Sequence, residues 1–70
     1  MHMIPVNSSN ISAVGYDPAN RVLCVSFHTG STYAYYDVPQ EIYMGLMNAS
    51  SVGRYHKEHI KHSFRYQQIG

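Results

Sequence analysis

The hydrophobic pattern of the chain changes its period once, near Asp37, and this change limits the fold more than any other feature. Before Asp37, apolar and polar side chains alternate. The alternation is clearest over residues 21–28, where the apolar residues Leu23, Val25 and Phe27 occupy every second position. Such alternation is typical of a half-buried strand. After Asp37, apolar residues recur at helical spacing. The pattern therefore predicts an α+β fold, with helices packed on one face of a small sheet.

Three strands are expected in the first half of the chain. They are separated by short turn sequences and cover residues 11–17, 21–28 and 32–36. Asp17-Pro18-Ala19-Asn20 suits a turn, because proline presets φ and the Asp17 side chain can accept hydrogen bonds from the following backbone. Gly30 marks a second turn. Strands joined by turns this short predict a three-stranded antiparallel meander.

The second half of the chain predicts two helices and a tail. Asp37 is expected to cap a first helix that has Pro39 in its first turn and runs to about residue 49. One serine of the pair at 50 and 51 is expected to cap a second helix over residues 52–64. Residues 66–70 are expected to form a short strand or a docked tail.

The length of 70 residues allows one domain, which buries only about 60% of the surface that the unfolded chain exposes. A large enzyme is excluded, and no segment approaches the roughly 18 apolar residues of a membrane-spanning helix. A single cysteine, Cys24, excludes a disulfide scaffold, and no signal peptide is visible, so a cytoplasmic protein is expected. Met1 and His2 are interpreted as a cloning remnant within a flexible segment 1–7, ahead of a single domain over residues 8–70.

Four of the five lysines and arginines lie between residues 54 and 65 and form a basic stripe, at Arg54, Lys57, Lys61 and Arg65. Their spacings of three, four and four place them on one side of a helix. Glu58 is the only acid in this span, whereas residues 1–53 carry one arginine and three acids. The stripe indicates either a face that binds phosphate groups or a solvated helix face.

The start of the second helix adds a further candidate contact to this stripe. Ser51 and Gly53 lie there, where backbone N–H groups without a helical partner can meet an anion. We therefore include both residues in the expected phosphate-binding surface.

Tyr33 and Tyr35 lie on the same face of the third strand, because side chains alternate along a strand. The hairpin loop decides which face this is. A two-residue loop of Gly30 and Ser31 places both tyrosines on the side of Ser26 and His28, where they can stack on bases. A three-residue loop buries them with the apolar residues of the second strand. The two-residue loop is the prediction.

Histidines and the cysteine complete the inventory of reactive side chains. His56, His59 and His62 follow each other at intervals of three, but together they turn about 120° around a helix, which does not suit one tetrahedral metal site. His56 and His59 are expected at the boundary with the sheet. Cys24 lies in a strand with no expected base beside it, so a structural thiol is expected. The sequence predicts no catalytic residues, no metal site and no cofactor.

An ordered series of residues resembles the KTSC domain, a small domain found at the C-terminus of some lysyl-tRNA synthetases and as a stand-alone bacterial protein. The series covers residues 8–66 and comprises Phe27-x-x-Gly30-x-x-Tyr33-x-Tyr35, Val38-Pro39, Ala49-x-Ser51-x-Gly53-x-Tyr55 and Ile60-Lys61. RNA binding is the function usually suggested for this family, so the resemblance implies it as an expectation for this chain. His56 and Lys57 depart from the family pattern, which has an aromatic residue and an asparagine there.

The sequence thus predicts a nucleic-acid-binding module, for RNA or single-stranded DNA, with little sequence preference. The basic stripe is expected to contact phosphates, and Tyr33 and Tyr35 to stack on bases. With four phosphate contacts on a single strand, a plot of the logarithm of affinity against the logarithm of salt concentration should have a slope of about −3. The alternative is a protein-interaction or homodimerisation module, because a small aromatic sheet gains stability when a partner covers it.

Overall fold

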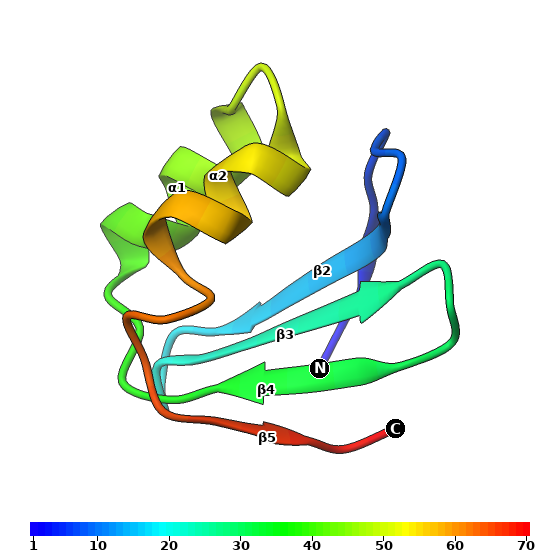
Figure 1. Ribbon diagram of the computed structural model, residues 1–70. Helices are drawn as coiled ribbons and strands as arrows, with labels where there is room; N and C mark the ends of the chain where they lie inside the picture. The colour runs from blue at the N-terminus through cyan, green and yellow to red at the C-terminus, as the bar shows by residue number, and fades with distance from the viewer.

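The computed structural model describes all 70 residues as a five-stranded antiparallel sheet with two helices on one face (Figure 1). The strands are neighbours in chain order across the sheet, β1-β2-β3-β4-β5. Their bounds are Ile4–Pro5 for β1, Ile11–Asp17 for β2, Val22–Phe27 for β3, Thr32–Tyr35 for β4 and Tyr66–Gln68 for β5. The helices are α1, Gln40–Asn48, and α2, Val52–His59. The α+β class is confirmed.

The sheet has two more strands than the predicted meander of β2, β3 and β4. Residues 66–68 form β5 beside β4, which is the short C-terminal strand that the sequence left as one of two alternatives. The pairing of Ile4 and Pro5 with β2 was not predicted, because two residues give no readable alternation. The three predicted strands are therefore the central part of a larger sheet.

The hairpin between β3 and β4 has a three-residue loop, so the predicted two-residue loop is wrong. The amide of Phe27 donates to the carbonyl of Ser31 at 2.8 Å, and the amide of Gly30 donates to the carbonyl of Phe27 at 2.9 Å. Gly30 has a φ of 100°. This is a turn followed by a left-handed residue, a common three-residue hairpin, and glycine adopts that conformation without strain.

This register reverses the faces of the third predicted strand. Tyr33 pairs with Val25 and Tyr35 pairs with Leu23, so both tyrosines point to the helix side of the sheet rather than to the side of Ser26. The core lies between this side and the helices, and Tyr35 is part of it. The other members of the core cluster are Ile11, Val14, Leu23, Val25, Val38, Leu46 and Ile60.

The first helix begins differently from the prediction. Asp37 has a φ of 57° and lies in the connection before the helix, so it is not the cap. Pro39 occupies the cap position, and no side chain caps the helix. Asparagine and aspartate tolerate the left-handed conformation better than other side chains, which explains why this residue makes the bend.

The second helix is shorter than predicted. Ser51 caps it, as one of the two predicted serines, and its Oγ accepts a hydrogen bond from the amide of Arg54 at 3.3 Å. The helix ends at His59 rather than at residue 64. The amides of Ile60 and Lys61 both donate to the carbonyl of His56, at 3.0 and 2.9 Å. This turn buries Ile60 completely and leads the chain down to β5 (Figure 1).

Candidate binding cleft

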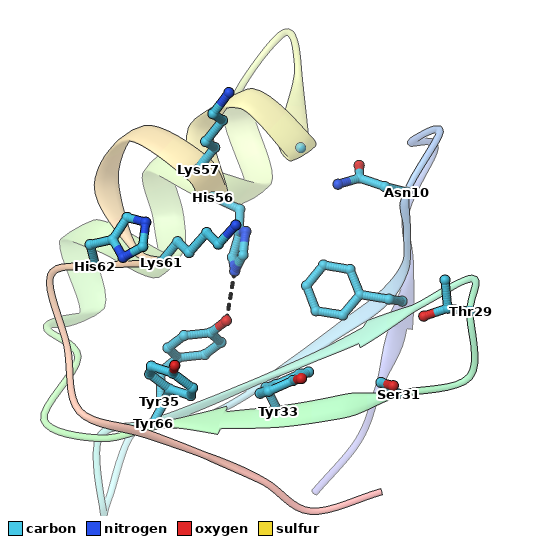
Figure 2. Close-up of a pocket in the computed structure, with 12 residues that line it drawn as sticks. Asn10, Thr29, Ser31, Tyr33, Tyr35, His56, Lys57, Lys61, His62 and Tyr66 are labelled. Carbon is cyan, nitrogen blue, oxygen red and sulfur yellow. Dashed lines mark hydrogen bonds between the residues drawn. The ribbon is translucent and has the colours of Figure 1, made fainter.

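A cleft of about 410 Å³ opens on the helix side of the sheet, between α2 and the strands β3, β4 and β5. Figure 2 shows the helix above it and the strands below it. Its residues come from both halves of the chain, and we call this set the cleft: Asn10, Phe27, Thr29, Ser31, Tyr33, Tyr35, Gly53, His56, Lys57, Lys61, His62 and Tyr66. Aromatic rings from the sheet therefore lie below the helix, and the side chain of Lys61 reaches toward them, whereas that of Lys57 extends away from the rings at the rim of the cleft (Figure 2).

The sheet side of the cleft is aromatic. Tyr33 makes an edge contact with Phe27, with ring centroids 5.9 Å apart, and lies 5.9 Å from Tyr66 at an interplanar angle of 57°. Tyr66 is 55% exposed, and Tyr33 is half-buried. The three-residue hairpin loop and the pairing of β5 with β4 bring these rings together, since they place Tyr33, Tyr35 and Tyr66 on one face.

Tyr35 is not available for stacking, in contrast to its predicted role. It is 3% exposed, and its ring contacts His56 at 5.5 Å and Tyr66 at 5.8 Å between centroids. Its hydroxyl forms a 2.8 Å hydrogen bond with Nε2 of His56, which is 4% exposed. The two side chains form a buried polar pair in the wall of the cleft (Figure 2).

Burial keeps both members of this pair uncharged. Burial, and secondarily the positive charge of Lys61, lowers the pKa of His56 from 6.5 to about 4. Burial, together with the neighbouring Tyr33 and Tyr66, raises the pKa of Tyr35 from 10 to about 12. At neutral pH the cleft thus holds a neutral imidazole beside a neutral phenol.

The predicted basic stripe is divided among three places. Lys57 and Lys61 line the cleft. Arg54 donates through Nε to Glu58 at 3.2 Å on the exposed side of α2. Arg65 lies over the ring of Tyr36, 5.2 Å from its centroid, and does not line the cleft. The helix ends before Arg65, so the regular spacing that suggested one continuous stripe does not continue that far.

Ser51 and Gly53 lie beside a second, more open hollow of about 780 Å³ at the start of α2. Polar residues of the 7–10 and 50–51 segments form most of its lining, together with Arg54 and Glu58. Asn10, Gly53 and Lys57 line both hollows. A side chain at position 53 would overlap the side-chain oxygen Oδ1 of Asn10, so glycine lets the helix start approach the 7–10 segment closely.

The remaining reactive side chains do not gather at one point. The histidines at positions 56, 59 and 62 diverge: His56 lies in the core, His59 is exposed and packs on Tyr55 with centroids 4.5 Å apart rather than at the boundary with the sheet, and His62 lines the cleft beyond the end of α2. No group of three or more histidine, cysteine, aspartate or glutamate side chains is placed to hold a metal ion.

Cys24 is buried on the side of the sheet opposite to the cleft, and burial raises the pKa of its thiol. Neither helix has the length and hydrophobicity that crossing a bilayer requires.

Several residues of the cleft were not predicted from the sequence. His56 was expected only at the boundary with the sheet, and Tyr66 had no assigned role. The helical position of His56 near Val52 and Ile60 was a usable sign of its burial. Tyr66 gave no comparable sign, because its place depends on β5 pairing with β4.

Comparisons with known proteins agree with this architecture. The solved structure of a KTSC domain protein from Yersinia pestis superposes with a TM-score of 0.93 at 41% sequence identity, over 99% of this chain and 97% of that one. A protein from Tsukamurella paurometabola is 48% identical over 63 residues, which cover 90% of this chain and 94% of that protein.

A longer relative is a lysine–tRNA ligase from Nostoc, which is 36% identical over 67 residues. The match covers 96% of this chain but 12% of the ligase, so the similarity concerns one small segment of that enzyme. The sequence profile of the KTSC domain matches residues 7–64, which is most of the chain. The resemblance seen in the sequence is thereby confirmed, and this chain belongs to the KTSC domain family.

Proposed function

We propose that this KTSC domain is a binding module for single-stranded RNA or DNA rather than an enzyme, and that the cleft is its binding site. The observation that carries the proposal is the position of Lys57 and Lys61 on one side of the cleft and of Tyr33 and Tyr66 on the other. Proteins that bind single strands combine such cations for the phosphates with aromatic rings for the bases.

The cleft favours unpaired bases over a duplex. Its rings lie between the sheet and α2, where a base can enter only if its own edges and faces are free. Tyr66, the more exposed ring, offers the larger stacking surface, and each stacked base contributes about 1–3 kcal/mol. The matched segment of a lysine–tRNA ligase supports RNA as one natural ligand.

An NMR titration of the labelled protein with a short mixed-sequence single strand tests the proposal. At low salt we expect shifts at Lys57, Lys61, Tyr33 and Tyr66, which physiological salt reduces because counterion release weakens phosphate contacts. The variant Lys61→Ala should weaken binding, and Arg65→Ala should serve as the matched control, because Arg65 lies outside the cleft. An absence of shifts at low salt would contradict the proposal.

A homodimerisation or protein-interaction role is the second candidate, and the edge strand β5 favours it. β5 pairs only with β4, and the side chains of Tyr66 in this strand and of Ile69 directly after it are 55% and 54% exposed. Exposed edge strands can pair with another chain. Sedimentation at several protein concentrations distinguishes this role from nucleic-acid binding. A dimer that forms as the protein concentration rises, and that no longer shows the oligonucleotide-induced NMR shifts, would support the interaction role.

A further inference from the structure

The buried pair of Tyr35 and His56 has no part in the contacts proposed above. His56 is the only polar residue that the core buries, and its hydrogen bond to Tyr35 is the only side-chain hydrogen bond in fully buried surroundings. A buried polar group costs stability unless it is well paired, and an apolar ring in its place avoids that cost. Such a pair in the wall of a cleft indicates a role in binding.

The pair retains hydrogen-bonding capacity toward the cleft. The Tyr35 hydroxyl has one partner, although a tyrosine hydroxyl can donate one hydrogen bond and accept two. Nε2 is the only atom of the His56 side chain that forms a hydrogen bond within the protein, and because no fully buried side-chain nitrogen or oxygen lacks a partner, Nδ1 is not fully enclosed. In Figure 2 the hydrogen bond lies among the other cleft residues, with the side chain of Lys61 close by. A planar ligand that enters between Lys61 and the aromatic rings therefore meets a polar group at the inner wall.

We propose that the Tyr35–His56 pair forms hydrogen bonds with the edge of an unpaired nucleobase held in the cleft, and this inference rests on the proposed function. The ligand class is a single strand with an accessible base, because a base pair occupies the same edge. The pair thus contacts the base edge, while the lysines contact the phosphates and Tyr33 and Tyr66 contact the base face.

The direction of the Tyr35–His56 hydrogen bond decides what the pair offers. When Nε2 of His56 carries the proton, it donates to the Tyr35 oxygen, and the tyrosine O–H is free to donate to a base acceptor. When Nε2 is unprotonated, the tyrosine O–H donates to it, and the tyrosine oxygen can accept from a base donor. The neutral histidine allows both arrangements. The pair therefore accepts bases of either kind, which predicts weak sequence preference.

The imidazole nitrogens of histidine-labelled wild-type protein report on this contact directly. During titration with a short single-stranded oligonucleotide, we expect the Nε2 and Nδ1 resonances of His56 to shift and to saturate together with the backbone shifts of Lys57 and Lys61. His59, which packs on Tyr55 outside the cleft, should stay unchanged. Saturating backbone shifts with an unmoved His56 ring would overturn this inference and leave the proposed function intact. No shifts at all would overturn both.

Removing one hydroxyl tests the same contact by affinity. Tyr35→Phe should weaken oligonucleotide binding about fivefold, which corresponds to the loss of one hydrogen bond. Tyr36→Phe is the matched control and should bind as the wild type does, because its hydroxyl donates to Gln67 at 3.1 Å outside the cleft. Equal affinity of folded Tyr35→Phe and Tyr36→Phe would overturn the inference. If Tyr35→Phe does not fold, the imidazole measurement decides alone.

Discussion

At the scale of a single residue, His56 is the group that we expect to determine the acid sensitivity of this domain. Its pKa is about 4 in the folded protein and near 6.5 in the unfolded chain, so the unfolded chain binds a proton first as the pH falls. The contribution of neutral His56 to stability is fully present above pH 6.5 and is lost as the pH falls toward 4. We expect the free energy of unfolding to fall by up to about 2 kcal/mol between pH 7 and pH 5.

Urea unfolding at the two pH values measures this loss. His62→Gln should lose as much stability as the wild type, because His62 is exposed. His56→Gln should be less stable at pH 7, since the Tyr35 contact changes, but should lose little further stability at pH 5. An equal loss in His56→Gln and His62→Gln would contradict the assignment of the acid sensitivity to His56.

At the scale of elements, the loop of the β3–β4 hairpin decides what the cleft contains. One residue more in the loop turns Tyr33 and Tyr35 from one face of the sheet to the other, because side chains alternate along a strand. The same register lets β5 place Tyr66 next to them. The aromatic side of the cleft is thus a consequence of one turn with a left-handed Gly30.

The contact between the helices depends on Gly45 of α1. A Cβ atom built at this position would overlap the hydroxyl of Tyr55 in α2 and lie 2.8 Å from its ring carbon Cζ. We therefore expect Gly45→Ala to lower the free energy of unfolding by about 1–2 kcal/mol, because overpacking outweighs the better helix propensity of alanine. For a domain of this size, the melting temperature should fall by at least about 4 °C.

Thermal unfolding followed by circular dichroism measures the effect. Gln40→Ala in the same helix is the matched control, because Gln40 is exposed, and its change should stay within about 0.5 kcal/mol. A Gly45→Ala variant as stable as the wild type would show that α2 can move away from α1 at little cost.

At the scale of the whole molecule, the structure reduces the number of cations that face the cleft. Two lysines line it, whereas Arg54 pairs with Glu58 and Arg65 lies on Tyr36. In a plot of the logarithm of the binding constant against the logarithm of the salt concentration, two phosphate contacts predict a slope of about −1.4. Four contacts predict a slope of about −3. Fluorescence anisotropy with a labelled single strand at several salt concentrations gives this slope.

Two variants separate the contributions of the cations to this slope. Lys57→Ala combined with Lys61→Ala should remove most of the salt dependence, and Arg65→Ala should leave it unchanged. A wild-type slope near −3 that Arg65→Ala reduces would show that the strand continues beyond the cleft to the far end of the predicted stripe.

The sequence by itself determined the local features of this protein. Alternation over residues 21–28 marked β3, the Asp17 turn and the Ser51 cap were readable from their side chains, and the ordered motifs identified the family. The strand, the turn and the cap each depend on neighbours within a few residues, where propensity and hydrogen bonding act directly.

Only the tertiary structure decided which residues meet in the cleft. The faces of Tyr33 and Tyr35, the burial of His56 and the place of Tyr66 depend on strand register and on the turn that ends α2. These contacts join positions from 8 to 35 residues apart, and their energy comes from packing between elements rather than from any local pattern. A helical spacing of charges could not show that Arg65 lies beyond the end of the helix, because the burial of Ile60 sets that end.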